Sequence, residues 1–334
     1  MTNILNSNHI LIDIETSGLK RDSDFVACIG VLYVNKDNII SHIQWINKTT
    51  KEEKDNLINL LSFLKNFSHI YSFGGKTFDL PFIIARCTFH NLDYSIFNDI
   101  HSVDIRKPLS NLASTRLDLE KLFGFSRVCK STGKELAKVC RLYESSGQNI
   151  YKSVISAHNL EELYSLLGMY EIYIALTNLK NATSSVPSNL TQNTEYTLFG
   201  FEFIFSFSYN FKVIYNNLCI SWDKFSSIVL IKSTFLSLNL KRYLCPHKDY
   251  FYILSENQIV HKSIAQFIAK SNKRKVSKNE CCIFKNALYT PLITSYKVSC
   301  NIWYDSSNNP FVSYGDITAK ILASQLLYLM LPSK

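Results

Sequence analysis

The chain has 334 residues, of which 46% are hydrophobic and 19% are charged, and its mean hydropathy is close to zero. This composition is typical of a soluble globular protein and excludes a disordered or collagen-like chain. No apolar stretch approaches the roughly 20 residues of a membrane span, and the N-terminus lacks the basic start of a signal peptide, so we expect neither a membrane protein nor a secreted one. The cysteines are scattered without a Cys-x-x-Cys pair, which fits a reducing cytoplasm.

The first part of the chain alternates between strand and helix patterns. Short runs of apolar and β-branched residues predict four strands, at residues 9–14, 25–34, 39–46 and 69–73. Apolar side chains at helical spacing predict a helix at residues 52–67, and further helices are expected between residues 78 and 180. Three strands, a helix, a strand and then helices indicate an α/β domain with a mixed sheet.

A stretch rich in Ser, Thr, Asn and Pro at residues 181–194 ends this pattern and is typical of a linker. Beyond it, apolar residues alternate with a period of two, which predicts a β-meander at residues 199–209, 212–220 and 228–240. A helix at residues 261–270, more strands and a terminal helix at residues 316–331 are expected to follow.

We therefore divide the chain into a first domain at residues 1–182, a linker at residues 183–194 and a smaller β-rich α+β domain at residues 195–334. The net charge of +9 is unevenly divided, because residues 1–182 hold 20 basic and 19 acidic side chains whereas residues 183–334 hold 16 and 8. A basic domain favours a polyanionic partner, since each phosphate contact releases counterions. A charge that serves only solubility is the alternative.

Basic side chains cluster within the second domain, between residues 262 and 278. They could follow a nucleic-acid backbone, and our candidate contacts are Lys262, Lys273, Arg274 and Lys275. Five phenylalanines that alternate between residues 199 and 207 could stack on bases, but a buried strand has the same pattern, and we favour a place in the core.

The first predicted strand carries two acids inside an apolar run. Asp13 and Glu15 are two positions apart, so their side chains point to the same face of the strand. Two ionised carboxylates on a buried face repel each other and lose hydration, and a divalent cation such as Mg²⁺ or Mn²⁺ removes both costs. The alternative is an edge strand whose acids are solvated. The apolar residues next to the acids favour a buried strand instead.

Two later segments carry further candidate residues. Asp79 follows an apolar strand and a Gly-Gly turn at the start of a helix, where the helix dipole alone would also favour an acid. His158 and Glu162 are four positions apart, so they share one face of a helix that we expect to begin there. Taken alone, this last pair is more typical of an ordinary helix N-terminus capped by Asn159.

Together, these segments resemble the three motifs of the DEDD family of 3′–5′ exonucleases, which have a ribonuclease H-like fold. The YprB-like members are the most similar, and the resemblance covers about residues 9–180. The matching stretches are Asp13-Ile-Glu15-Thr-Ser-Gly-Leu, Phe78-Asp79-Leu-Pro81, His101-Ser-Val-Asp104-Ile-Arg106, Arg116-Leu-Asp-Leu-Glu120 and His158-Asn-Leu-Glu-Glu162. The resemblance implies a mixed five-stranded sheet flanked by helices.

The resemblance also implies a two-metal mechanism that hydrolyses phosphodiester bonds at single-stranded or frayed 3′ ends of DNA or RNA. Two divalent cations, Mg²⁺ or Mn²⁺, would be held by the four acids, and His158 would orient or deprotonate the attacking water. The acids are Asp13, Glu15, Asp79 and Glu162. Nucleic-acid contacts in this domain would come from Thr16, Gly18, Leu19 and Arg106.

One departure from the family leaves a second interpretation open. Glu162 stands where the family has Asp, so an extra methylene must be accommodated at a metal that demands near-ideal geometry. A nucleic-acid-binding protein with a degenerate nuclease domain is therefore the alternative. We favour the active enzyme, because the other four positions match and Glu is still an oxygen ligand. A scaffold protein in a repair or processing complex would make no use of the acids and ranks third.

Overall fold

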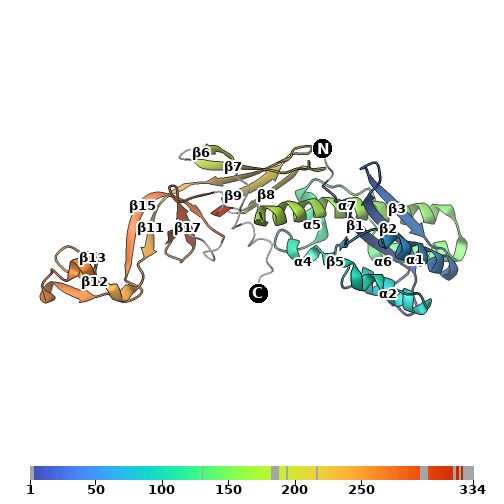
Figure 1. Ribbon diagram of the computed structural model, residues 1–334, viewed down its shortest axis with the longest axis horizontal. Coiled ribbons are helices and arrows are strands. Elements are labelled where there is room, and N and C mark those ends of the chain that lie inside the picture. Colours follow the sequence, from blue (N-terminus) through green and yellow to red (C-terminus); the bar gives the residue numbers. More distant parts are fainter. Residues whose placement is uncertain are drawn as a thin grey trace.

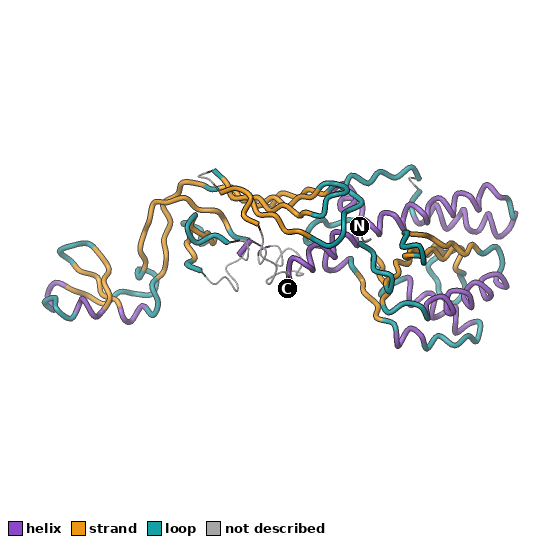
Figure 2. Tube along the Cα trace, turned by 45° about the horizontal axis from the view of Figure 1, so that its top comes forward, coloured by secondary structure: helices purple, strands orange, loops and turns teal. Residues whose placement is uncertain are grey.

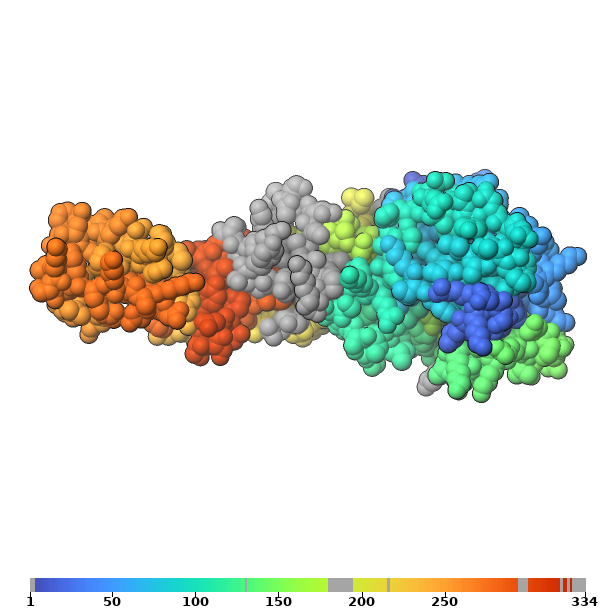
Figure 3. Space-filling view, turned by 90° about the horizontal axis from the view of Figure 1, so that it is seen from below, coloured from blue at the N-terminus to red at the C-terminus, as the bar shows by residue number. Residues whose placement is uncertain are grey.

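The computed structural model describes residues 4–129, 131–181, 188–192, 195–215, 217–293, 300–318, 321, 322 and 325. The molecule is elongated, with a lobe of helices around a sheet at one end and a narrow β-rich arm at the other (Figures 1 and 3). A long antiparallel sheet connects the two ends (Figure 2). Among the described residues, none of the helices combines the length and apolar character that a bilayer crossing needs.

The N-terminal lobe is built around a mixed five-stranded sheet with the order β3-β2-β1-β4-β5. β1 pairs antiparallel with β2 and parallel with β4, so it is the central strand. β3 is antiparallel to β2, and β5 is parallel to β4. The strands are β1 (His9–Thr16), β2 (Val26–Val34), β3 (Ile40–Ile46), β4 (His69–Ser72) and β5 (His101–Asp104). The expected α/β architecture with a mixed five-stranded sheet flanked by helices is confirmed.

Helices cover both faces of this sheet (Figure 1). Ile10, Ile12 and Ile14 of β1 pack in one apolar cluster with α1 and α2. Leu11 belongs to the other cluster, which includes the apolar side chains of α7. Because side chains alternate along a strand, the odd-numbered residues of β1, such as Leu11, face α7. The helices are α1 (Thr50–Leu64), α2 (Asp79–Phe89), α3 (Ile96–Asp99), α4 (Arg106–Leu109), α5 (Arg116–Leu122), α6 (Gly133–Ser146) and α7 (Asn149–Asn181).

A buried ion-pair network fixes α1 and α2 to the sheet. Glu53 of α1 is fully buried, accepts a hydrogen bond from the backbone N–H of Val26 at 2.9 Å, and pairs with Arg86 and His90 at 2.8 Å each. Removing one partner of such a network leaves a buried charge uncompensated, which costs several kcal/mol. Asp79, the first residue of α2, is therefore held in a well-fixed position relative to β1.

The long helix α7 corrects one expectation. We expected a helix to begin at His158, but α7 begins at Asn149, so His158 and Glu162 lie in its interior. No Gly or Pro interrupts the sequence between Gly147, which ends α6 with φ of 68°, and Gly168. Ile155 is buried against α6, and this contact stabilises the first turns of α7.

Strands dominate the rest of the chain. β6–β10 form an antiparallel sheet with the order β6-β7-β10-β9-β8, and β11, β15, β17 and β16 form a closed barrel. A three-stranded sheet, β13-β12-β14, lies at the tip of the arm with the short helix α8 (Figure 1). The elements are β6 (Ser188–Gln192), β7 (Tyr196–Glu202), β8 (Phe211–Tyr215), β9 (Leu218–Trp222), β10 (Ile228–Thr234), β11 (Leu236–Tyr243), β12 (Tyr250–Ile253), β13 (Gln258–His261), α8 (Lys262–Ala265), β14 (Lys273–Lys275), β15 (Cys282–Pro291), β16 (Ile302–Tyr304) and β17 (Pro310–Ser313).

Several expectations for this part are refined. The helix expected at residues 261–270 is only the single turn of α8, which His261 caps by accepting a hydrogen bond from the backbone N–H of Ser263. The stretch at residues 183–194, expected as a linker, includes strand β6, which pairs with β7. The terminal helix expected at residues 316–331 lies largely outside the described residues.

The two parts of the chain share one apolar core. The cluster that contains the buried residues of α7 also contains phenylalanines of the C-terminal part, so the stripe between residues 199 and 207 packs inside, as we expected. The buried members of the stripe are Phe199, Phe201, Phe205 and Phe207. A hydrogen bond of 3.2 Å from the Tyr209 hydroxyl to the Tyr164 carbonyl joins the same two parts.

Candidate active site

The two acids of β1, Asp13 and Glu15, face α7, because they lie two and four positions after Leu11 and side chains alternate along a strand. Asp13 pairs in register with Gly30 of β2, and the antiparallel ladder has an irregularity between Glu15 and Thr16. The side chain of Asp13 is 14% exposed and that of Glu15 is 11% exposed. An apolar strand thus places two nearly buried carboxylates beside α7, as the alternation in the sequence predicted.

Asp79 reaches the same place from the start of α2. The turn before it requires Gly75, since a Cβ at that position would lie 2.2 Å from the Ser72 hydroxyl oxygen and 2.9 Å from Oδ2 of Asp79. Asp104 at the end of β5 supports this turn by accepting the backbone N–H of Gly74 at 2.8 Å. Asp104 is therefore a structural residue, and the Gly-Gly turn lets Asp79 lie close to the sheet.

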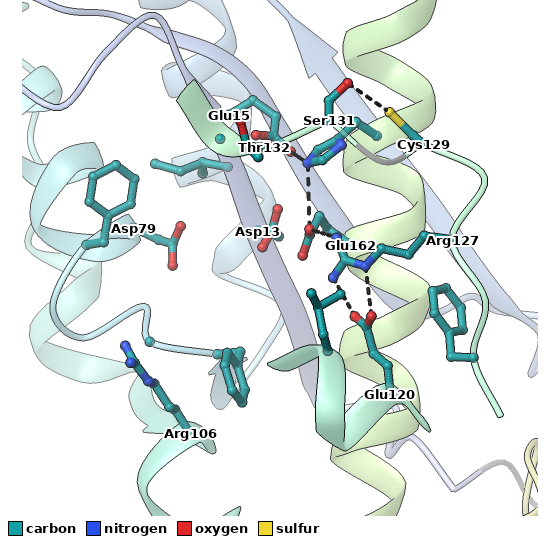
Figure 4. Close-up of a pocket in the computed structure, with 18 of the residues that line it drawn as sticks. Asp13, Glu15, Asp79, Arg106, Glu120, Arg127, Cys129, Ser131, Thr132 and Glu162 are labelled. Carbon is teal, nitrogen blue, oxygen red and sulfur yellow. Dashed lines mark hydrogen bonds and ion pairs between the residues drawn. The ribbon is translucent and has the colours of Figure 1, made fainter. Parts of the chain in front are cut away.

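One pocket of about 800 Å³ brings together the predicted catalytic residues (Figure 4). They come from β1, α2 and α7, which are distant in sequence. Arg106, the predicted phosphate contact, also lines this pocket. The predicted residues among those that line it are Asp13, Glu15, Asp79, Arg106, His158 and Glu162.

Burial and mutual repulsion disfavour the charged forms of three of these acids. Burial raises the pKa of Asp13 and of Glu15 well above its usual range, and neighbouring carboxylates raise both further. Burial is also the main reason why the pKa of Asp79 is raised to about 6. Oε1 of Glu15 is buried and accepts no hydrogen bond from the described residues. A bound cation would therefore stabilise the charged forms of these carboxylates.

His158 lies between two of the acids. Its Nε2 is 3.6 Å from Oε1 of Glu162 and 3.9 Å from Oε1 of Glu15. Burial lowers the pKa of His158 below its usual value, so the ring is neutral near pH 7. A neutral imidazole beside two carboxylates can accept a proton, and the carboxylates would then stabilise the imidazolium.

Glu162 has a different environment from the other acids, because two arginines contact it. Oε1 pairs with Nη1 of Arg127, and Oε2 pairs with Nη1 of Arg116, which also lies 3.6 Å from Oδ1 of Asp13. Burial alone would raise the pKa of Glu162, but the two guanidinium groups hold it below its usual value. The sequence analysis did not predict these contacts, and the signal that could have indicated them is the match at Arg116-Leu-Asp-Leu-Glu120.

Asn159 is a second site residue that sequence reasoning did not identify. We considered it as a helix cap, but it lies inside α7, and its Nδ2 donates to the backbone carbonyl and to Oδ2 of Asp13. It is fully buried. The signal that could have indicated it is the match at His158-Asn-Leu-Glu-Glu162.

The donor set of the pocket fits a hard divalent cation. Asp13, Glu15 and Asp79 supply carboxylate oxygens whose raised pKa values a bound cation would offset. In the described part of the chain, however, no group of three or more His, Cys, Asp or Glu side chains is arranged closely enough to hold a metal ion. In this structure, Glu162 pairs with Arg116 and Arg127 instead of joining the other three acids.

The predicted nucleic-acid contacts fall into two groups. Thr16, Gly18 and Leu19 line a second pocket of about 590 Å³ that also includes Glu15, so they adjoin the acids. Leu19 is 81% exposed. The remaining candidates lie at the tip of the arm, at the opposite end of the molecule from α1 and α2 (Figure 1). They are Lys262, Lys273, Arg274 and Lys275.

The arm residues differ in how they are held. Lys262 pairs with Asp249 at 2.8 Å, and Arg274 pairs with Glu280 at 3.2 Å. Lys273 donates to the backbone carbonyl of Ala265. Lys275 is exposed. The structure therefore does not bring these four residues to the pocket that contains the acids.

A family model matches the N-terminal lobe. Residues 10–174 match the family model described as the RNase_H superfamily. No curated protein matches the chain. Among solved structures, the family B DNA polymerase from the hyperthermophilic archaeon Pyrobaculum calidifontis is similar with a TM-score of 0.38 at 9% identity. That comparison covers 96% of this chain and 45% of the polymerase, so the chain spans less than half of the polymerase's length.

Proposed function

Residues 10–174 form a ribonuclease H-like domain, and we propose that the protein is a divalent-metal-dependent 3′–5′ exonuclease that hydrolyses phosphodiester bonds of DNA or RNA. The observation that carries this proposal is that the four predicted carboxylates and a neutral histidine line one pocket. Three of the acids, Asp13, Glu15 and Asp79, are buried or nearly buried and have raised pKa values, which is an unfavourable arrangement without a cation. Their chemistry therefore supports a metal-dependent reaction.

We assign the roles as follows. Asp13, Glu15 and Asp79 hold the cations, with Glu162 as the fourth ligand. When bound, Mg²⁺ or Mn²⁺ activates a water and neutralises developing charge on the phosphate. His158 would accept a proton from the attacking water at Nε2, the ring nitrogen that faces Glu15 and Glu162. Arg106, which is exposed at the pocket, binds a phosphate of the substrate.

The remaining predicted residues serve substrate binding in this proposal. Thr16, Gly18 and Leu19 hold the 3′ end in the pocket next to Glu15. The arm binds a part of the nucleic acid farther from the 3′ end through Lys262, Lys273, Arg274 and Lys275. We also keep the division into residues 1–182 and 195–334, with the shared core as the contact between the two domains.

End-labelled single-stranded DNA and RNA provide the direct test. We expect shortening from the 3′ end with Mn²⁺ or Mg²⁺, no reaction with EDTA, and loss of the reaction in Asp13→Asn. Asp55→Asn is the matched control, because Asp55 is an exposed acid of α1 outside the pocket. Cleavage that resists EDTA, or that is equal in Asp13→Asn and wild type, would contradict the proposal.

A second function is favoured by one observation, the pairing of Glu162 with two guanidinium groups. If these pairs persist, Glu162 is not available as a ligand, and the protein binds nucleic acid without hydrolysing it. The same oligonucleotides distinguish the two functions. Binding in a mobility assay without any shortening in Mn²⁺ would support the second.

A further inference from the structure

Arg127 joins two glutamates at the edge of the pocket. It lies in the loop between α5 and α6, and its Nε and Nη2 donate to the two oxygens of Glu120 while Nη1 donates to Oε1 of Glu162 (Figure 4). Glu120 is 2% exposed and also accepts a hydrogen bond from the Ser165 hydroxyl. The guanidinium is therefore held by a second, buried carboxylate in addition to that of Glu162.

The backbone of the same loop is fixed to α7. The carboxylate of Glu161 accepts the N–H of Val128 at 2.9 Å and the N–H of Cys129 at 3.0 Å. Two adjacent residues of α7 thus have separate tasks, since Glu161 holds the loop backbone and Glu162 holds the side chain of Arg127. These contacts hold the loop so that the guanidinium of Arg127 lies against the carboxylate of Glu162.

Arg116 supplies the second positive charge from the first residue of α5. Its Nη1 contacts Oε2 of Glu162, and its Nη2 donates to the backbone carbonyl of Glu162 at 2.7 Å. The bond to the backbone carbonyl would remain if the Glu162 carboxylate moved to bind a metal. The bond of Arg127 to Glu162, in contrast, involves only that carboxylate. Arg127 is therefore the arginine that can leave Glu162 while it keeps its pair with Glu120.

We propose that Arg127 is a positioning residue that competes with a divalent cation for Glu162. This inference rests on the proposed function, in which Glu162 is a metal ligand. A guanidinium and a metal ion on one carboxylate oxygen repel each other strongly in a nearly buried pocket. The cation binds with Glu162 only when Arg127 withdraws towards Glu120, so Arg127 lowers the affinity of the site for metal.

Mn²⁺ binding by the full-length protein tests this inference, with free Mn²⁺ measured by electron paramagnetic resonance. We expect Arg127→Gln to bind Mn²⁺ at least about tenfold more tightly than wild type, since close charge pairs couple by more than 1 kcal/mol. Arg141→Gln is the matched control, because Arg141 pairs with Asp24 in the same domain and not with any acid of the proposed site. It should change the affinity much less.

The outcomes separate this inference from the proposed function. If wild type binds Mn²⁺ and Arg127→Gln binds it no more tightly, the competition is refuted and the proposed function stands. If neither protein binds Mn²⁺, both are refuted. Should Arg127→Gln lack a cooperative thermal transition, Arg127→Lys replaces it, because a lysine cannot bridge Glu120 and Glu162 as a guanidinium does. Arg127→Lys must then bind Mn²⁺ more tightly than wild type, and equal or weaker binding overturns the inference.

Discussion

The side-chain amide of Asn159 orients Asp13. Its Nδ2 lies 3.3 Å from the backbone oxygen and 3.2 Å from Oδ2 of Asp13, while its Oδ1 accepts a hydrogen bond of 3.0 Å from Nε2 of Gln44. The approach of α7 to the sheet depends on Gly30, where a Cβ would lie 1.9 Å from Oδ1 of Asn159. The amide thus connects α7, β1 and β3 at the proposed metal site.

Replacement of Asn159 by Ala should therefore affect both stability and metal binding. We expect the free energy of unfolding to fall by about 1–3 kcal/mol, because Asp13 and Gln44 lose a buried partner. We also expect weaker Mn²⁺ binding, since the Asp13 carboxylate is no longer oriented. Urea denaturation and Mn²⁺ titration measure the two effects. Wild-type values in both would show that Asn159 does not position Asp13.

How far the sequence predicts this site depends on the range of each interaction. Asp13 and Glu15 were placed correctly on one face because strand alternation is a local rule. The tasks of Asn159 and Arg127 were not predicted, because each depends on contacts between segments distant in sequence, which no local pattern encodes. The same limit explains the wrong helix start at His158, where packing of Ile155 on α6 extends α7 towards the N-terminus.

The C-terminal part shows the same contrast. The alternation from residue 199 predicted a strand to residue 209 and a buried phenylalanine stripe. The strand, β7, ends at Glu202, whereas most of the stripe is buried as predicted. Period-two patterns do not specify which strands pair, so neither the barrel of β11, β15, β17 and β16 nor the sheet at the tip of the arm was foreseen. The prediction of a helix at residues 261–270 was wrong beyond its first turn, α8.

Glu171 should make the stability of the protein depend on pH. It lies on α7, is 1% exposed, and accepts the backbone N–H of Ser208 at 3.1 and 3.0 Å. Burial raises its pKa from 4.5 to about 7, so the folded protein binds this proton more tightly than the unfolded chain does. Its stabilising contribution is complete below pH 4.5 and is lost as the pH rises through 7.

Glu171→Gln isolates this contribution, because glutamine is neutral at every pH. Between pH 4.5 and pH 8, we expect the free energy of unfolding of wild type to fall by about 3 kcal/mol more than that of Glu171→Gln. Urea denaturation at both pH values gives the difference. Other acids with raised pKa values contribute equally to both proteins and cancel. Parallel pH profiles would show that Glu171 is not protonated in the folded state near neutral pH.

Charge reversal on the arm should weaken nucleic-acid binding in a salt-dependent way. Lys275 and Lys278 are exposed near the tip, so Lys275→Glu with Lys278→Glu replaces two positive charges with two negative ones without breaking the bond between Lys273 and Ala265. We expect the slope of log affinity against log salt to decrease by about 0.7 for each lost phosphate contact with a single strand. Fluorescence anisotropy with a labelled oligonucleotide measures it.

The matched control for the arm reverses two exposed lysines at the other end of the molecule, Lys51 and Lys54 of α1. It changes the net charge by the same amount. If both double variants reduce the slope equally, the arm is not a specific contact and its lysines contribute only to the overall charge.

Substitutions of Glu162 distinguish an active from a degenerate site. If the enzyme is active with Glu162 as a ligand, Glu162→Asp should keep activity within about tenfold and Glu162→Gln should abolish most of it, because an amide cannot balance the charge of a metal. If the site is degenerate, wild type should be nearly inert and Glu162→Asp should raise metal affinity. Rates on end-labelled single strands and Mn²⁺ titrations distinguish the cases. Wild-type activity in Glu162→Gln would exclude Glu162 as a ligand.

His158→Ala should slow an active enzyme without removing its metals. The ring is neutral near pH 7, and its Nε2 faces Glu15 and Glu162, so its loss removes the proposed proton acceptor but none of the carboxylates. We expect the rate to fall by roughly 10²–10⁴, the usual contribution of a positioned general base, while Mn²⁺ affinity changes little. His42→Ala is the control, because His42 is exposed on β3. If His158→Ala and His42→Ala are equally active, His158 is only a structural part of α7, and another group accepts the proton.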